Sequence, residues 1–254
     1  ELSASSLMAA SGKDEALVGH LESFWSAACK HLQVPDDLRK SWMETIVERY
    51  RERHRAYHTL HHLDELFQYC AKHQEELKRP HLVTMAIFFH DIIYDPKQAA
   101  PANENMSALE FVRFADEVKT ATEGKSFGKE DIDLVEAWIK KTADHVCTSE
   151  DSKDCKLFMD WDIAILGQPW PRYERYMKSV RTEYRHIPYF IWCVARPRFL
   201  RKTLDQKQVF ATDHYQKLLG GQARENLLEE IRILESEVGF IGRTAARLIL
   251  YFLS

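Results

Sequence analysis

The chain has 254 residues, of which 45% are hydrophobic and 29% charged, so it is long enough for one large globular domain or two small ones. Its net charge of −4 at pH 7 argues against nucleic acid or an anionic membrane as a partner. With only 9 Gly and 8 Pro, the composition favours helices over a turn-rich β fold.

The cysteine content and the apolar segments indicate the cellular location that we expect for the protein. The five cysteines are an odd number and include no C-x-x-C pair, so we expect reduced thiols in a cytoplasmic protein. Residues 1–13 lack the basic and apolar regions of a secretory signal, while a targeting segment ahead of Glu1 is left open. The apolar stretch 248–253 is far shorter than the roughly 20 residues that span a bilayer, so no membrane insertion is expected.

In the first half of the chain, apolar residues recur at three- and four-residue intervals, which is the period of an α-helix. This spacing predicts helices over residues 14–32, 36–53, 60–77, 103–118 and 131–142. The nearly continuous apolar run 80–89 has the composition of either a buried helix or a central strand. Polar connections are expected at 95–102, 119–128 and 145–154.

In the second half, an apolar segment at 157–166 ends at Gly167. Helical spacing then continues over residues 173–184, 189–204, 223–237 and 241–252, although Pro197 interrupts the second of these. No internal repeat, low-complexity segment or linker divides the chain. We therefore predict one all-α domain over residues 1–254 with an N-terminal helical extension.

Three histidines are concentrated between Tyr57 and His62. His58 and His62 are four residues apart, so on a helix they would share one face. If Thr59 caps the helix instead, His58 precedes it and the two side chains are held less closely. Either arrangement makes this segment a candidate source of metal ligands or of an acid–base group.

Acidic residues interrupt two apolar segments. His90 and Asp91 end the run 82–89, where a carboxylate costs several kcal/mol unless a cation or a donor compensates it. Asp160 and Asp162 interrupt the later segment and point about 200° apart on a helix, so at most one of them faces a given site. Since imidazole and carboxylate are natural ligands of divalent metals, these residues predict a metal site.

The order of these residues resembles the HD-domain superfamily of metal-dependent phosphohydrolases, which is named after its His-Asp dyad. An uncharacterised branch of predicted HD phosphohydrolases is similar in its flanking residues, namely Arg55-x-Tyr57-His58-x-x-x-His62, Phe89-His90-Asp91-x-x-Tyr94, Asn103-Glu104-x-x-Ser107-Ala108, Asp160-x-Asp162-x-x-x-Leu166-Gly167, Arg181-x-Glu183-Tyr184 and Ala223-Arg224-x-Asn226. The resemblance covers about residues 20–235 and implies an HD-domain-like helical bundle.

The resemblance also implies a ligand set of His62, His90, Asp91 and one later acid. In HD proteins the last ligand is the acid of an Ala-Asp-like pair at the start of a helix. Trp161-Asp162 occupies that position here, so Asp162 is favoured and Asp160 is the alternative. The bound ion would be Mn, Fe, Co, Zn or Mg, among which the residues do not discriminate.

The segment from Tyr57 to His62 also resembles the Y-H-N-x-x-H segment of cyclic-nucleotide phosphodiesterases, in which the first histidine is the general acid. This implies that His58 donates a proton to the leaving oxygen while His62 binds metal. Thr59 replaces the usual Asn, and the chain has no counterpart of the long C-terminal region that forms the cyclic-nucleotide pocket. Hydrolysis of cyclic nucleotides is therefore not implied.

We expect a metal-dependent phosphohydrolase that acts on a small phosphate ester, with nucleotides preferred by family analogy, through metal-activated water. Glu104 fits either the orientation of water or a second hydrated metal, and equally a solvated acid in a first helical turn. His145 is the candidate for a second metal or for phosphate binding. Lys97, Arg181 and Arg224 are candidates to bind phosphate oxygens.

Two other functions fit the same residues. Some HD-like proteins bind two irons and activate O₂, which would need a complete second ligand set around a residue such as His145. A non-catalytic helical binding module is the other alternative. A homo-oligomer is compatible with the sequence, although no pattern encodes one.

Overall fold

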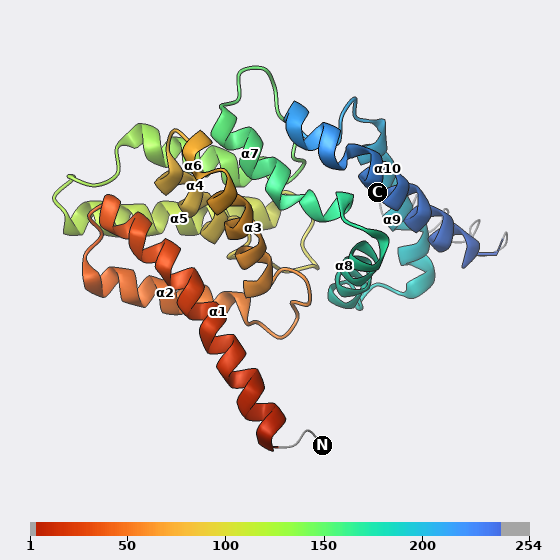
Figure 1. The fold of residues 1–254 in the computed structure, drawn as a ribbon, viewed down its shortest axis with the longest axis horizontal. Coiled ribbons are helices and arrows are strands. Elements are labelled where there is room, and N and C mark those ends of the chain that lie inside the picture. Colours follow the sequence, from red (N-terminus) through yellow and green to blue (C-terminus); the bar gives the residue numbers. More distant parts are fainter. Residues whose placement is uncertain (1–3, 240–254) are drawn as a thin grey trace. The chain divides into compact units, whose positions relative to one another are not determined.

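The computed structural model describes residues 4–239, and the side chains of residues 14–239. Within that range the chain forms α-helices and short 3₁₀ helices without a strand (Figure 1). The all-α class predicted from the spacing is therefore confirmed. None of the described helices combines the length and the apolar character needed to cross a bilayer.

The chain groups into two compact units, Glu1–Met159 and Asp160–Ser254. The elements of the first are α1 (Ala4–His31), α2 (Asp36–Tyr50), α3 (Leu60–Lys72), η1 (Gln74–Glu76), α4 (Pro80–Phe89), α5 (Ala102–Ala121) and α6 (Lys129–Lys141). Helix α7 (Lys153–Asp162) begins in the first unit and crosses the division, and η2 (Ala164–Gly167), α8 (Trp170–Glu183), α9 (Tyr189–Asp205) and α10 (Asp213–Ser236) follow. The expected single domain stays a prediction.

Helix α4 is the central element of the first unit and packs against α1, α3, α5 and α6. Its residues from Leu82 to Phe89 are all buried, which explains why the run is apolar on every side and lacks a helical stripe. Pro80 at the start supplies a φ suited to the first turn of a helix. The choice between buried helix and central strand is thus settled in favour of the helix.

Aromatic rings fill the space around α4. Phe88 contacts Trp25 of α1 at 5.3 Å between ring centroids, and Phe89 contacts Trp42 of α2 at 5.6 Å and Phe114 of α5 at 5.4 Å. Large rings at these separations bury much apolar area and pack in preferred geometries. The C-terminal end of α4, which His90 and Asp91 follow, is therefore held in place by a rigid core.

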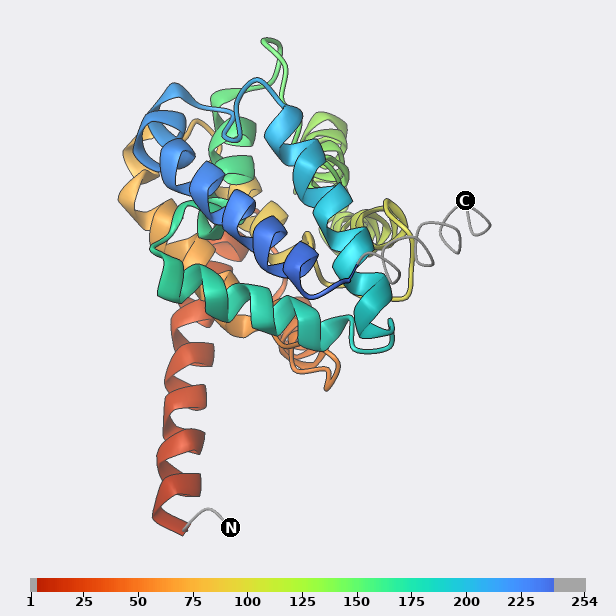
Figure 2. The ribbon, with the colours of Figure 1, turned by 90° about the vertical axis from the view of Figure 1, so that its right-hand side faces the viewer.

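Helix α1 begins well before the predicted residue 14, and its first turns extend beyond the other helices of its unit (Figure 1 and Figure 2). Helix α3 ends at Lys72, earlier than predicted, and is followed by the separate turn η1. Helix α9 continues through Pro197. The predicted helix 241–252 lies outside the described residues.

In the second unit, α10 packs against α8, α9 and η2 and begins ten residues before the predicted start at 223. Thr212 caps it by accepting a hydrogen bond from Tyr215 N at 3.2 Å. The added half contains Gly220 and Gly221, and glycine is a poor helix former. Gly220 leaves room for the side-chain amide of Gln216, whose Oε1 accepts from Val209 N at 2.9 Å.

Gly167 marks the closest approach of η2 to α10. A Cβ at this position would lie 2.8 Å from the carbonyl oxygen of Leu219 and closer still to the Leu219 Cβ. Replacement by Ala should therefore overpack the contact and lower the free energy of unfolding by about 1–3 kcal/mol in urea denaturation. The matched control is Gly19→Ala on α1, where no atom lies within 4 Å and Ala should stabilise by about 0.5–1 kcal/mol. Equal effects of both substitutions would contradict this account.

Candidate metal centre

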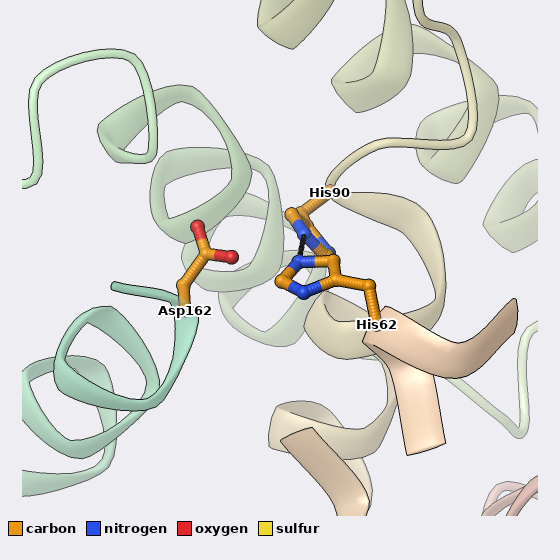
Figure 3. A group of neighbouring side chains, drawn as sticks. All are labelled: His62, His90 and Asp162. Carbon is orange, nitrogen blue, oxygen red and sulfur yellow. Dashed lines mark hydrogen bonds between the residues drawn. The ribbon is translucent and has the colours of Figure 1, made fainter. Parts of the chain in front are cut away.

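Two buried histidines from different helices of the first unit form the centre of the site. His62 lies in the first turn of α3, and His90 directly follows the last residue of α4. Their side chains are 3% and 1% exposed, and their Nε2 atoms lie 3.2 Å apart (Figure 3). The sequence predicted both as ligands, and the fold brings them together.

The tautomer of His90 is set by its other ring nitrogen. Nδ1 lies 2.9 Å from the carbonyl oxygen of Ile87, which can only accept, so Nδ1 carries the proton. If the ring is neutral, its Nε2 therefore presents a lone pair towards His62. Metal-binding histidines are typically oriented by such a hydrogen bond from the second nitrogen.

The spacing of these donor atoms fits a shared ion. Two ligand atoms at about 2.0–2.1 Å from one ion, at angles of roughly 90–110°, are separated by about 2.9–3.4 Å. The two Nε2 atoms at 3.2 Å fall in this range. Asp91 Oδ2 lies 3.1 Å from His90 Nε2, but Asp91, which was predicted as a ligand, is not a member of the group of side chains that lie close enough together to share one ion. Two imidazoles with a neighbouring carboxylate form a donor set suited to a divalent transition metal.

Helix α7 brings a second carboxylate. Its start is fixed to the start of α4, because Asp154 accepts hydrogen bonds from Lys78 N at 3.0 Å and Arg79 N at 2.8 Å. One turn before the end of α7, the ring of Phe158 contacts the ring of His90 at 5.7 Å.

Asp162 is the last residue of α7. One ligand atom from each of His62, His90 and Asp162 lies within 4.8 Å of the other two (Figure 3). This group can hold a metal ion. A cation would also offset the charge of the two carboxylates, Asp91 and Asp162, beside the buried imidazoles.

Asp160, the alternative ligand, has other partners. Its carboxylate is fully buried and accepts hydrogen bonds from Ala211 N, from Thr212 N at 2.9 Å and from the Thr212 hydroxyl. It therefore fixes the segment at which α10 begins. Two residues apart on α7, the two acids point in different directions, and Asp162 is the one that joins the histidines.

His58 lies at the rim of this group. Thr59 is the N-cap of α3, so His58 precedes the helix and does not share a helical face with His62. Its Nε2 is 4.0 Å from Asp91 Oδ2, and its side chain is 21% exposed. The rings of Tyr94 and Tyr57 pack against it at 4.3 Å and 5.1 Å. A group so placed can reach both solvent and the ligands.

Glu104 and His145 also lie outside the group. Glu104 is in the first turn of α5, and His145 follows α6 in a loop, with a positive φ of 57°. Among the residues that the structure describes, His62, His90 and Asp162 form the one group of three or more His, Cys, Asp or Glu side chains close enough to hold an ion. The described residues do not form around His145 the second set of ligands that a di-iron site would need.

Two of the three residues predicted to bind phosphate, Arg181 and Arg224, hydrogen-bond backbone carbonyls in the structure. Arg181 donates to the carbonyls of Tyr184 at 2.6 Å and Ile187 at 2.9 Å, beyond the end of α8. Arg224 donates to the carbonyl of Leu204 at 3.3 Å, near the end of α9. Both arginines thus satisfy carbonyls around helix C-termini.

Lys97 is exposed in the loop that follows the His-Asp dyad. Its backbone N–H donates to Asp95 at 3.0 Å, and this hydrogen bond is the main reason why the pKa of the Asp95 carboxyl is lowered. Lys97 thus stabilises this loop through its backbone N–H. The ammonium group remains a candidate for contact with substrate.

Arg55 is the residue whose importance the sequence did not reveal. It belongs to the motif that contains His58, but a single arginine before a helix is normally a surface residue. In the structure its guanidinium is enclosed beside the site. The motif singled out Arg55 without assigning it a role, and the sequence did not predict that its side chain is buried while those of Arg51 and Arg53 are exposed.

Comparison with known proteins adds no relative. No protein-family model, curated protein or solved structure matches the chain. Membership of the HD superfamily therefore stays a prediction from the motifs, and function has to be inferred from the site.

The two acids of α7 provide a direct test of the site. Asp162→Asn should lower the affinity for Mn²⁺ at least about tenfold, since even groups that only orient ligands contribute about 10–100-fold. Asp160→Asn should leave Mn²⁺ affinity unchanged and reduce stability by about 0.5–2 kcal/mol, because it weakens the start of α10. Calorimetric titration and thermal denaturation measure the two effects. The reverse pattern would make Asp160 the ligand.

Proposed function

We propose that this protein is a metal-dependent phosphohydrolase of the HD type that acts on a small-molecule phosphate ester. The observation that carries the proposal is the buried pair of His62 and His90, with a partly exposed His58 beside Asp91. A divalent ion held there would supply Lewis acidity, which makes water nucleophilic near neutral pH and offsets charge that develops on phosphate.

His62, His90, Asp91 and Asp162 would hold the ion. The surroundings of the two histidines are aromatic, since Tyr57 contacts the ring of His62 at 5.0 Å and Phe158 contacts the ring of His90. Apolar walls lower the local dielectric constant and strengthen the interaction between an ion and its anionic ligands. They also keep bulk water from the buried side of the site.

His58 is proposed as the general acid. It is the imidazole of this cluster that solvent reaches, and Tyr57 and Tyr94 restrict its ring on two sides. From this position it can donate a proton to the leaving oxygen of an ester bound against Asp91 and the two buried histidines.

Nucleotides are the proposed substrate class, and this preference comes from the resemblance to HD proteins. The cytoplasmic location is likewise a proposal, supported by five cysteines of which none is in a disulfide. A di-iron oxygenase gains no support from the residues that the structure describes, because they assemble one potential ligand group and not two.

Replacement of His58 separates proton transfer from metal binding. His58→Ala should reduce phosphate release from p-nitrophenyl phosphate or nucleoside monophosphates by about 10²–10⁴-fold, with Mn²⁺ content unchanged. The matched control is His61→Ala, which removes an exposed imidazole three residues along the chain and should leave turnover as in the wild type. Wild-type turnover by the His58→Ala variant would exclude it as the acid. No turnover by the wild-type protein would contradict the hydrolase itself.

A further inference from the structure

We infer that Arg55 is a positioning residue that sets His58 against the metal-binding turn after α4. This inference rests on the proposed function. The Arg55 side chain is fully enclosed, and its guanidinium donates to three backbone carbonyls. Nη1 donates to His58 O at 3.1 Å and to Asp91 O at 2.8 Å, and Nη2 donates to Ile92 O at 3.1 Å.

These carbonyls belong to two segments that are far apart in the sequence. His58 lies in the connection between α2 and α3, whereas Asp91 and Ile92 lie in the turn that follows α4. A single planar cation therefore joins the backbone of the proposed acid to the backbone of a proposed ligand. The side chains of the same two residues, His58 and Asp91, approach to 4.0 Å.

The enclosed charge of Arg55 also has one acidic and two aromatic neighbours. Its Nε donates to Glu52 at 3.3 Å, and its guanidinium carbon lies 4.8 Å from the ring centroid of Tyr50 and 5.4 Å from that of Tyr94. Such stacking favours a delocalised, weakly hydrated cation. Tyr94 in turn packs on the ring of His58. Arg55 therefore holds the His58 backbone through its carbonyl and one side of the His58 ring through Tyr94.

The geometry requires the fork of a guanidinium and not only a positive charge. Donors on a rigid plane fix the two carbonyls relative to one another, whereas a lysine offers one flexible ammonium group. Displacement of a reacting group by about 1 Å can cost about 10²-fold in rate. Arg55 touches neither an ion nor a substrate in this arrangement, so it acts through His58 and Asp91.

The test compares Arg55→Lys and Arg55→Ala with Arg53→Ala, which removes an exposed arginine from the same connection. Three properties are measured on each folded protein: Mn²⁺ affinity by titration, the imidazole signals of His58 in ¹⁵N-histidine NMR spectra, and kcat and KM for phosphate release. His58 is assigned from the spectrum of His58→Ala. Thermal denaturation reports stability separately.

For Arg55→Lys we expect Mn²⁺ affinity to fall about 10–100-fold, the His58 signal to move, and kcat to fall far more than KM rises. Guanidinium ion at millimolar concentration should partly restore Arg55→Ala, and Arg53→Ala should behave as the wild type. An Arg55→Lys protein with lower stability, but unchanged Mn²⁺ affinity and an unchanged His58 signal, would overturn the inference. If the wild type hydrolyses no ester, the proposed function fails, while Mn²⁺ affinity and the His58 signal still decide the place of Arg55.

Discussion

Two imidazole nitrogens meet at 3.2 Å between the first turn of α3 and the end of α4, and the proposed metal site depends on this contact. Neutral histidines in such a place satisfy one another only if one donates and the other accepts. The bond from His90 Nδ1 to the Ile87 carbonyl leaves the His90 Nε2 lone pair as the acceptor. An ion between the rings would use both Nε2 lone pairs, so that metal binding and the tautomer of His62 are linked.

The surrounding helices keep this contact in place. Helix α4 is buried along its length and ends at His90, and aromatic side chains from α1, α2 and α5 pack against its last residues. Helix α7 is tied to the start of α4 through Asp154 and reaches His90 through Phe158. Arg55 donates hydrogen bonds to the carbonyls of His58 and Asp91. It thereby joins the segment before α3 to the turn after α4.

Much of this arrangement was predictable from residue order. The helical period predicted the class and most elements. The histidine cluster and the dyad at the end of an apolar run pointed to His62 and His90, and the resemblance to HD proteins favoured Asp162 over Asp160. Helix α10 was predicted too short, and its first half contains a fit of the Gln216 side chain against Gly220 that composition does not encode. The partners of Asp160 are contributed by residues 211 and 212, about fifty positions later in the sequence, and could not be inferred from its neighbours. Arg55 was not recognised as a site residue for the same reason, since Asp91 and Ile92 come from a distant turn.

We propose that His62 and His90 bind one ion together. This can be tested with a crystal structure of the protein loaded with Zn²⁺, with anomalous scattering measured at the zinc edge. We expect one peak at about 2.0–2.1 Å from Nε2 of both histidines, with the Asp91 or Asp162 carboxylate completing the shell. A structure in which Zn²⁺ binds elsewhere, with the two imidazoles still hydrogen-bonded to each other, would contradict it.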